Sequence, residues 1–362
     1  ADLVTRQPLA LTLLSPNNSS VVLKTPSLPA PLHLVFALLS AQGLTFRERS
    51  SAIIMSLKLA LKGYKLAQDI SVKDLLQQHK QSSKTIQSLW QPLCLATMNT
   101  PIEKASAQVF LNVLKDSFNY KRSDSDCLFL TRDLSQAFTL PAIKFIIEHG
   151  GQIHCKQKII QFDSLNQQFT IHSNDLSYQS QTLVLATPPH ITKKLISRHG
   201  NAVLKPPTAS LDYYYEPICT IYLQYPPETQ TKTIMTGFFN TTSQWAIDRS
   251  VCQQAGLIAV VISGSGNHTK ISHKQLAEKV HHELSSCLPD LPQWLDYRVI
   301  IEKRATFSCR VNIEQQRPYN NTQIPNLFLA GDYTNTHYPA TLEGAVRSGI
   351  NAAQQIILSH AQ

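Results

Sequence analysis

Two residues near the C-terminus, Gly331 and Asp332, have the clearest capacity for chemistry in this chain of 362 residues. They follow the apolar run 327–330, which is typical of a buried strand in a covered sheet. Glycine lets the backbone turn and lets a ligand approach closely, and a carboxylate accepts hydrogen bonds from hydroxyl groups well. Because ligands of such sheets bind beyond the carboxyl ends of the strands, we expect Asp332 to contact a polyol.

The segment after this turn indicates the chemical class of the ligand. A helix is expected to open at 340–346, and its first turn carries N–H groups and the positive end of the helix dipole. Such a helix end suits the pyrimidine edge of a flavin, which is negatively charged when the flavin is reduced. Gly344, Ala345 and Gly349 are small enough for a flat ring to pack against the backbone. Together, the turn, the carboxylate and this helix predict a flavin site.

The motif that usually accompanies such a site is missing from the sequence. No G-x-G-x-x-G occurs, and 12 glycines are few for a nucleotide-binding α/β protein. The chain begins with Ala1, and residues 9–14 read like the continuation of a strand. We therefore expect an N-terminally truncated chain that lacks a first βαβ unit.

The overall composition narrows the function classes. The length predicts about two domains, and 43% hydrophobic against 16% charged residues is typical of a globular protein. The formal charge of +9 is scattered, which favours a solvated basic surface, with contact to an anionic membrane surface as the alternative. Nucleic acid is not expected as a partner, because basic and aromatic residues do not interleave.

Cysteines, histidines and apolar runs bear on compartment and metal binding. The seven cysteines form no C-x-x-C, which argues against a zinc site or a disulfide framework and favours a cytoplasmic location. His281 and His282 would point apart on a helix, so no metal is expected. Apolar runs are too short to span a bilayer, and the alternative is a peripheral position on the inner face of the cell membrane. The helices expected in 32–66 could provide that contact, since their lysines can extend to the surface.

Periodicity and turn residues predict the elements around the flavin motif. Capping boxes are expected to begin helices at Thr45 and Ser71. The other expected elements are a hairpin in 8–24, helices in 84–118, 140–149 and 273–287, and strands at 152–160, 168–173 and 182–187. Segments typical of a nucleotide-binding fold thus alternate with helical and mixed segments, which favours a discontinuous two-domain architecture.

The C-terminal motif resembles the flavin signature of the amine oxidase and phytoene desaturase superfamily. Within it, the segments 90–101, 125–135 and 302–307 resemble the hydroxysqualene dehydroxylases, also called squalene-associated FAD-dependent desaturases. The resemblance covers nearly the whole chain. It implies an α/β, mixed α+β fold: a discontinuous, Rossmann-like FAD domain that lacks its first βαβ unit, and a substrate domain with a mixed sheet and helices.

The resemblance also implies domain segments and cofactor contacts. The FAD-domain segments would be 136–195 and 311–362, and the substrate-domain segments 1–135 and 196–310. Ile159 would lie near the adenine, Ala186 and Thr187 at a strand end near the dinucleotide, and Gly331 and Asp332 near the ribityl or pyrophosphate. The contacts implied for the flavin ring are Thr341, Leu342, Glu343, Gly344 and Ala345. Because the glycine fingerprint and the acidic residue for the adenosine ribose have no counterpart, the chain taken alone is expected to bind FAD poorly.

The reaction implied is the reductive removal of an allylic hydroxyl from hydroxysqualene, which gives squalene for hopanoid synthesis. It needs a hydride, a proton for the leaving hydroxyl and a dry apolar tunnel for a lipophilic isoprenoid. The candidate acids are Asp126, His337 and Tyr338, and the sequence does not decide between them. Phe238, Phe239 and the tyrosines at 213–215 are expected to supply apolar walls.

Three alternatives remain open at this point. The chain could be a phytoene-desaturase-like or an amine-oxidase-like flavoenzyme. It could also be an inactive remnant that binds only a membrane or a partner. Covalent flavin attachment is not expected, because no cysteine follows Cys309.

Overall fold

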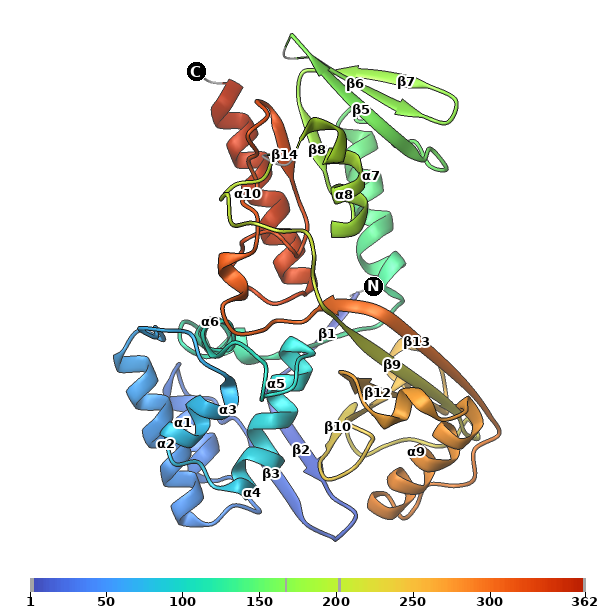
Figure 1. Ribbon diagram of the computed structural model, residues 1–362. Coiled ribbons are helices and arrows are strands. Elements are labelled where there is room, and N and C mark those ends of the chain that lie inside the picture. Colours follow the sequence, from blue (N-terminus) through green and yellow to red (C-terminus); the bar gives the residue numbers. More distant parts are fainter. Residues whose placement is uncertain (1–2, 167, 201–202, 361–362) are drawn as a thin grey trace. The chain divides into compact units, whose positions relative to one another are not determined.

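A computed structural model describes residues 3–166, 168–200 and 203–360 (Figure 1). Helices and strands are mixed along the chain, as the predicted fold class requires. The chain packs as two compact units, and each is built from two stretches of sequence: unit 1 from 1–145 and 215–305, and unit 2 from 146–214 and 306–362. These bounds describe packing alone, so the assignment of FAD-binding and substrate-binding segments stays a prediction.

A seven-stranded mixed sheet forms the centre of unit 1, in the order β13-β9-β12-β11-β10-β2-β3. The pair β2–β10 is parallel, and the pairs from β9 to β10 and from β2 to β3 are antiparallel. The predicted hairpin at 8–24 is present as β2 and β3. The strands are β2 Ala10–Leu14, β3 Ser20–Lys24, β9 Tyr215–Gln224, β10 Met235–Phe238, β11 Trp245–Asp248, β12 Leu257–Ser263 and β13 Asp296–Phe307.

Helix α9 (His273–Cys287) packs on this sheet and closes its main core. Leu276, Ala277, Val280 and Leu284 lie on one side of α9, at the spacing of an amphipathic helix, and all four are fully buried. They contact the alternate residues of β9 and β12 that point toward the helix. Ser272 and Gln275 form a capping box, which fixes the residue at which α9 begins.

The remaining helices of unit 1 come from the N-terminal third of the chain. The predicted caps are present: the Thr45 hydroxyl accepts a hydrogen bond from the Glu48 amide, and the Ser71 hydroxyl accepts one from the Asp74 amide. The helices are α1 Leu32–Leu39, α2 Phe46–Leu61, α3 Val72–Gln78, α4 Ser83–Thr85, α5 Gln91–Met98 and α6 Ala107–Phe118. A separate antiparallel pair, β1 (Val4–Gln7) and β4 (Cys127–Leu130), completes unit 1.

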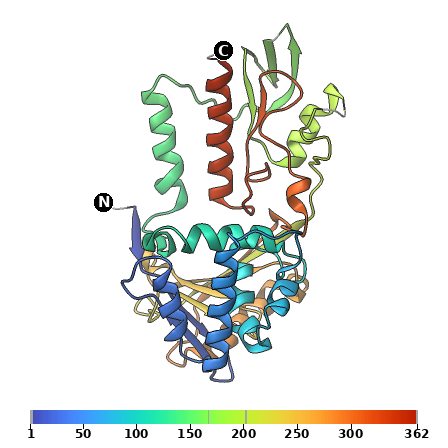
Figure 2. The same cartoon turned by 90° about the vertical axis from the view of Figure 1, so that its left-hand side faces the viewer.

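Unit 2 contains a short parallel strand pair and a three-stranded antiparallel sheet. Figure 2 shows α10, in dark red, as one continuous helix of this unit. Helix α7 (Leu140–Glu148) spans the boundary between the two units. The elements of unit 2 are β5 Ile159–Leu165, β6 Gln168–Ser173, β7 Ser177–Ser180, β8 Leu183–Leu185, α8 Pro189–Ile196, β14 Leu327–Leu329 and α10 Leu342–His360.

One predicted strand is wrong in most of its length. The strand expected at 152–160 begins only at Ile159, and it continues to Leu165. Cys155 and Lys156 form a turn instead, and Lys156 has a φ of 61°, in the left-handed region that a strand does not contain. A run of alternating residues therefore did not suffice to predict pairing, because a turn without glycine or proline interrupts it.

The described residues contain no helix that is long and apolar enough to cross a membrane. This agrees with the short apolar runs in the sequence.

A substitution at Gly43 tests how tightly the connection between α1 and α2 is packed against the β2–β3 hairpin. It has a φ of 82°, and a Cβ atom there would lie 1.7 Å from the Ser20 carbonyl oxygen. Gly63 has a φ of 63° with no atom within 4 Å of such a Cβ, which makes it the matched control. Gly63→Ala is expected to cost about 1–2 kcal/mol through its backbone conformation alone. Gly43→Ala should cost at least about 2 kcal/mol more in urea unfolding, and equal losses would contradict the described packing.

Candidate flavin site

The predicted strand-end residues of unit 2 lie at one edge of a parallel strand pair. β14 and β8 pair in parallel, with Leu327 opposite Leu183 and Leu329 opposite Leu185. The Ala330 amide donates to the Leu185 carbonyl at 3.0 Å, so the pairing extends past the strands. As a result, 186–187 and 331–332 leave the same edge of the sheet, where a ligand of a parallel sheet binds.

A chain of hydroxyl groups holds these two strand ends together. The Thr192 hydroxyl on α8 contacts the Thr187 hydroxyl at 2.8 Å and the Tyr333 hydroxyl at 3.2 Å. Thr192 and Tyr333 are buried, and burial raises the pKa of Tyr333 to about 12. Tyr333 therefore acts as a neutral hydrogen-bonding group at physiological pH.

The buried Ser348 hydroxyl fastens α10 to the end of β14. It accepts a hydrogen bond from the Gly331 amide at 3.0 Å and contacts the Thr334 hydroxyl at 2.7 Å. The Asn320 side-chain amide donates to it at 3.0 Å and also donates to the Leu329 carbonyl at 2.8 Å. The helix is thus held in a fixed position relative to the Gly331–Asp332 turn.

The first turn of α10 contains the residues expected beside the flavin ring. The Thr341 hydroxyl accepts from the Gly344 amide at 3.1 Å, which is the cap that starts the helix. A Cβ atom on Gly344 would lie 2.8 Å from the Pro339 carbonyl oxygen, so the close approach of the preceding turn also requires a glycine here. Glu343 pairs with Arg347 at 2.7 Å, and Leu342 is exposed.

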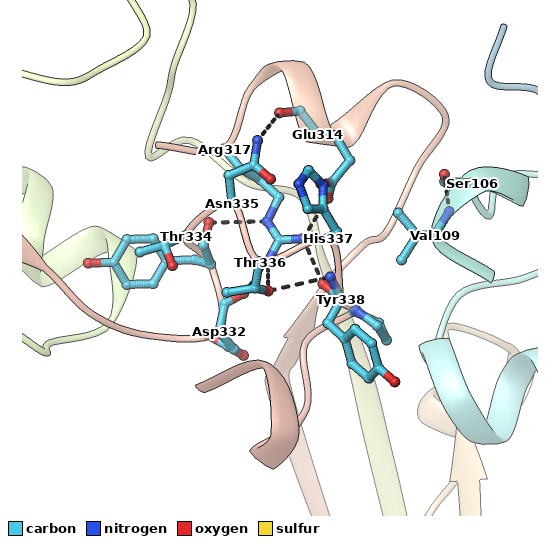
Figure 3. A network of polar contacts seen from close by, with 12 residues as sticks. Ser106, Val109, Glu314, Arg317, Asp332, Thr334, Asn335, Thr336, His337 and Tyr338 are labelled. Atoms are coloured by element: carbon cyan, nitrogen blue, oxygen red, sulfur yellow. Dashed lines mark hydrogen bonds and ion pairs between the residues drawn. The ribbon is translucent and has the colours of Figure 1, made fainter. Parts of the chain in front are cut away.

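The loop between Gly331 and α10 is organised by Arg317, whose side chain is fully buried (Figure 3). Its guanidinium donates to the carbonyl oxygens of Asp332 (2.7 Å), Tyr333 (3.4 Å) and Tyr338 (2.6 Å). It also donates to the Thr336 hydroxyl at 2.9 Å and to the Glu314 carboxylate at 2.6 Å. These five bonds match the five N–H donors of an arginine, so a single side chain fixes the path of the loop.

Glu314 connects this buried cation to His337. One carboxylate oxygen accepts from Arg317, and the other is 2.6 Å from the His337 Nδ1 atom. The hydrogen bond to Glu314 and the charge of Glu314 raise the pKa of His337, whereas partial desolvation of the ring and the charge of Arg317 oppose this rise. Burial works to raise the pKa of Glu314, but the bond from His337 and the charge of Arg317 lower it. The pair therefore favours a charged imidazolium facing a carboxylate, with the imidazole side chain exposed.

The three candidate acids lie in different surroundings. His337 and the neighbouring Tyr338 belong to the loop that Arg317 holds, and the Tyr338 ring, which is buried, lies 3.9 Å from the Arg347 guanidinium. Asp126 belongs to unit 1, where its carboxylate lies 4.0 Å from the Arg122 guanidinium and is nearly buried. No atom of the described residues gives the buried Asp126 Oδ1 a hydrogen bond. Their catalytic roles stay predictions.

The chemistry of unit 2 fits a flavin. Burial raises the pKa of Asp332, although the charge of Arg317 and hydrogen bonds from the backbone of Tyr333 and Asp332 oppose this. Hydroxyl donors of a ribityl chain would add to these bonds and stabilise the charged carboxylate. The strand-end threonine and the capped N-terminus of α10 provide further polar groups. Ile159 begins β5 in the three-stranded sheet of the same unit. These residues stay candidates for holding FAD.

An apolar cavity of about 140 Å³ lies within unit 1. Residues of β2, β3, α1, α2, α5 and α6 line it, and no charged side chain is among them. Its one aliphatic hydroxyl, that of Ser56, donates to the Ala52 carbonyl at 2.9 Å. The expected wall residues Phe238 and Phe239 do not line this cavity. Both are largely buried, and both border a separate pocket of about 480 Å³ in unit 1, so their role as walls stays a prediction.

The residues that organise the site were not predicted from the sequence. Arg317 and Glu314 lie three positions apart in a polar stretch, and that spacing is a weak signal. Most partners of Arg317 are backbone carbonyls, which leave no mark on the sequence. Ser348 could have been found, because a small polar residue on the buried side of a glycine-rich helix indicates a hydrogen bond into the interior.

Replacing Arg317 tests whether it organises the loop. Arg317→Met removes one donor from Glu314 and from three carbonyl groups, of which Glu314 keeps its bond to His337 and the Tyr333 carbonyl keeps its bond from the Tyr213 hydroxyl. Breaking such a buried pair costs about 3–5 kcal/mol. Arg317→Lys keeps the charge but not the five-donor geometry, so an intermediate loss of stability is expected in urea unfolding. The control is Arg310→Met, which removes a partly exposed guanidinium 3.9 Å from the Tyr214 ring and should cost about 1 kcal/mol or less. Equal losses for Arg317→Met and Arg310→Met would contradict the assignment.

The chain is similar in sequence to hydroxysqualene dehydroxylases and to 15-cis-phytoene desaturases. The hydroxysqualene dehydroxylase of Zymomonas mobilis is 25% identical over 288 residues, which are 75% of this chain and 64% of that protein. The 15-cis-phytoene desaturase of Solanum lycopersicum is 25% identical over 355 residues, which are 91% of this chain and 60% of that protein. The chain therefore spans roughly three fifths of the length of these two relatives.

Solved structures and a family model agree on the fold. Cyclohexylamine oxidase from Brevibacterium oxydans superposes with a TM-score of 0.67 at 12% identity, over 99% of this chain and 83% of that one. The model of flavin-containing amine oxidoreductases matches residues 14–357. The predicted superfamily and its flavin cofactor are thereby confirmed, and the chain belongs to the flavin-containing amine oxidoreductase family.

Proposed function

We propose that this chain is part of an FAD-dependent oxidoreductase that removes the hydroxyl group of hydroxysqualene to give squalene. The reaction replaces a carbon–oxygen bond by a carbon–hydrogen bond, and the hydroxyl leaves as water. It therefore consumes one hydride and one proton. Reduced FAD supplies the hydride when it is bound, and the protein must supply the proton, the dry surroundings and the orientation.

The apolar cavity in unit 1 is the observation that carries the substrate class of this proposal. With a volume of about 140 Å³ it has room for a segment of a hydrocarbon chain, and its lining offers that segment apolar contacts and no charge to desolvate. An amine substrate would instead leave its ammonium group without a counter-charge in that lining, at a large desolvation cost. The cavity therefore supports a lipophilic isoprenoid over an amine.

The His337–Glu314 pair supports an acid-dependent reaction. A histidine whose pKa is raised by a carboxylate carries its proton at neutral pH, as a donor to a leaving hydroxyl requires. In the proposal His337 is the proton donor, Glu314 positions its ring and Arg317 holds Glu314. Asp126 and Tyr338 stay weaker candidates. Asp126 pairs with Arg122, and the guanidinium of Arg347 covers the Tyr338 ring.

Desaturation of a phytoene-like hydrocarbon is the second candidate. The phytoene desaturases match 91% of this chain, a larger share than the hydroxysqualene dehydroxylases match. Desaturation removes hydrogen from the substrate and has no leaving hydroxyl, so it needs no proton donor of this kind. The same apolar cavity would suit both substrates.

A turnover assay separates these candidates. The whole protein of which this chain is part is incubated with reduced FAD and hydroxysqualene, and the products are analysed by mass spectrometry. Flavin retained on a desalting column shows how much cofactor is bound. Squalene is the expected product, and His337→Gln should lower its rate by about 100-fold or more. Turnover of phytoene or of an amine in place of hydroxysqualene would overturn the proposal. Retained flavin without turnover of any of these substrates would indicate an inactive remnant.

The pH dependence of squalene formation tests the role of Glu314. Below about pH 6.5 a histidine is protonated with or without its partner, so the wild type and Glu314→Gln should have similar rates there. As the pH rises, the wild type keeps its proton longer, because Glu314 raises the pKa of His337. The alkaline fall in rate should therefore occur at lower pH in Glu314→Gln. Glu228→Gln, in an exposed loop, is the control, and identical profiles for all three proteins would exclude His337 as the donor.

A further inference from the structure

Helix α2 has an apolar stripe on the side that faces solvent. Its buried residues Ala52, Met55 and Leu59 mark the side toward the core. Ile54, Leu57 and Leu61 follow one another at spacings of three and four, on the opposite side, and Leu61 is 88% exposed. An ordinary surface helix carries charged or polar residues at these positions, so the stripe needs an explanation.

The neighbouring helix α1 has a second stripe of the same kind. Leu32, Phe36 and Leu39 are exposed, and their spacing of four and three residues places them on one side of the helix. The helices α1 and α2 contact each other and lie together at one edge of unit 1 in Figure 1. The six residues of the two stripes are named here the α1–α2 apolar surface.

Basic residues lie beside this surface. Lys58 and Lys62 follow Ile54 at spacings of four residues, so they lie along one edge of the α2 stripe. A surface groove of about 910 Å³ runs along the same helix, and its charged lining residues are Arg47, Lys58 and Lys80 against a single carboxylate, that of Glu48. Burial lowers the pKa of His79 in this groove, and the charges of Lys58 and Lys62 lower it further. The surroundings therefore attract anions.

An anionic bilayer is the partner that complements both the apolar residues of this surface and the basic residues beside it. A helix with leucine, isoleucine and phenylalanine on one side and lysines at its edge lies in the headgroup region of membranes. A second copy of this chain would bring like charges together, since the chain carries a net charge of +9 and the groove is basic. Anionic headgroups complement those charges, and acyl chains complement the exposed leucines.

The α1–α2 apolar surface also belongs to the helices that enclose the apolar cavity. Leu34 and Val35 of α1 and Ile53 and Leu57 of α2 line that cavity, and Leu57 is also part of the exposed stripe. A hydrocarbon that leaves a bilayer at this surface would thus pass between apolar side chains without crossing water. This step rests on the proposed function, whereas the docking itself does not.

We propose that α1 and α2 form a docking surface for anionic lipid bilayers, through which an isoprenoid substrate enters the cavity between the same two helices.

Vesicle co-sedimentation of the whole chain tests this proposal without substrate or flavin. The vesicles contain phosphatidylcholine alone or mixed with phosphatidylglycerol. The triple variant Phe36→Gln, Ile54→Gln, Leu61→Gln changes exposed residues that do not line the cavity. The matched control is Leu165→Gln, Leu176→Gln, Leu295→Gln, which changes three exposed leucines outside α1 and α2. Circular dichroism melts verify that both triple variants are folded, and Leu61→Gln alone serves if the first one is not.

The wild type and the control are expected to sediment with the mixed vesicles. The triple variant is expected to bind these vesicles at least about tenfold more weakly. Lys58→Gln and Lys62→Gln should each weaken binding about fivefold, and high salt should do the same. Unchanged binding of the triple variant would overturn the proposal. So would a wild-type dimer in sedimentation equilibrium that the triple variant abolishes, since this would assign the surface to a second copy. Vesicle binding without squalene formation would leave the docking surface standing and refute only the proposed reaction.

Discussion

The arrangement of unit 2 depends on one buried cation. The loop from Gly331 to Ala340 has no regular helix or strand, so its carbonyl groups have no ladder to join, and three of them turn toward the interior. Arg317 satisfies all three and is itself neutralised by Glu314. A buried guanidinium is tolerated only when its donors are satisfied and its charge is paired, and both conditions hold here. Because Glu314 has a second oxygen, the same ion pair orients His337, and structural support and acid chemistry are joined in one network.

Local signals in the sequence predicted the elements of the site but not the interactions that hold them. The apolar run before Gly331 and the small residues after Thr341 predicted β14 and α10, because periodicity and turn residues act over a few neighbours. The contacts of Arg317 join residues up to 21 positions apart, through backbone atoms that every residue carries. The strand expected before Ile159 failed for a related reason. Lys156 adopts a left-handed conformation without the glycine or asparagine that usually marks one.

The apolar cavity illustrates a second limit of sequence reasoning. Phe238 is expected to be a tunnel wall because it is large and apolar, and it joins the core between the sheet and α9 while it borders a pocket other than the apolar cavity. Core and cavity linings have the same composition, and only the packing of several elements decides which residues face empty space. The cavity forms where α1 and α2 meet the β2–β3 hairpin and α5 and α6, and no one of these segments contains that information alone.

The choice between dehydroxylation and desaturation depends on how protons are handled. Both reactions exchange hydride with a flavin and both accept an apolar chain, so neither the family nor the cavity distinguishes them. A leaving hydroxyl is a poor leaving group unless it is protonated, whereas hydride removal from a hydrocarbon gains nothing from an imidazolium. The carboxylate partner keeps His337 protonated where an isolated histidine would already be neutral. Maintaining that proton requires Glu314 to stay ionised despite its burial, and the hydrogen bond from His337 and the charge of Arg317 both lower the pKa of Glu314. A site built only for desaturation would still need Arg317 and Glu314 to hold the loop, but it would not need the imidazolium of His337.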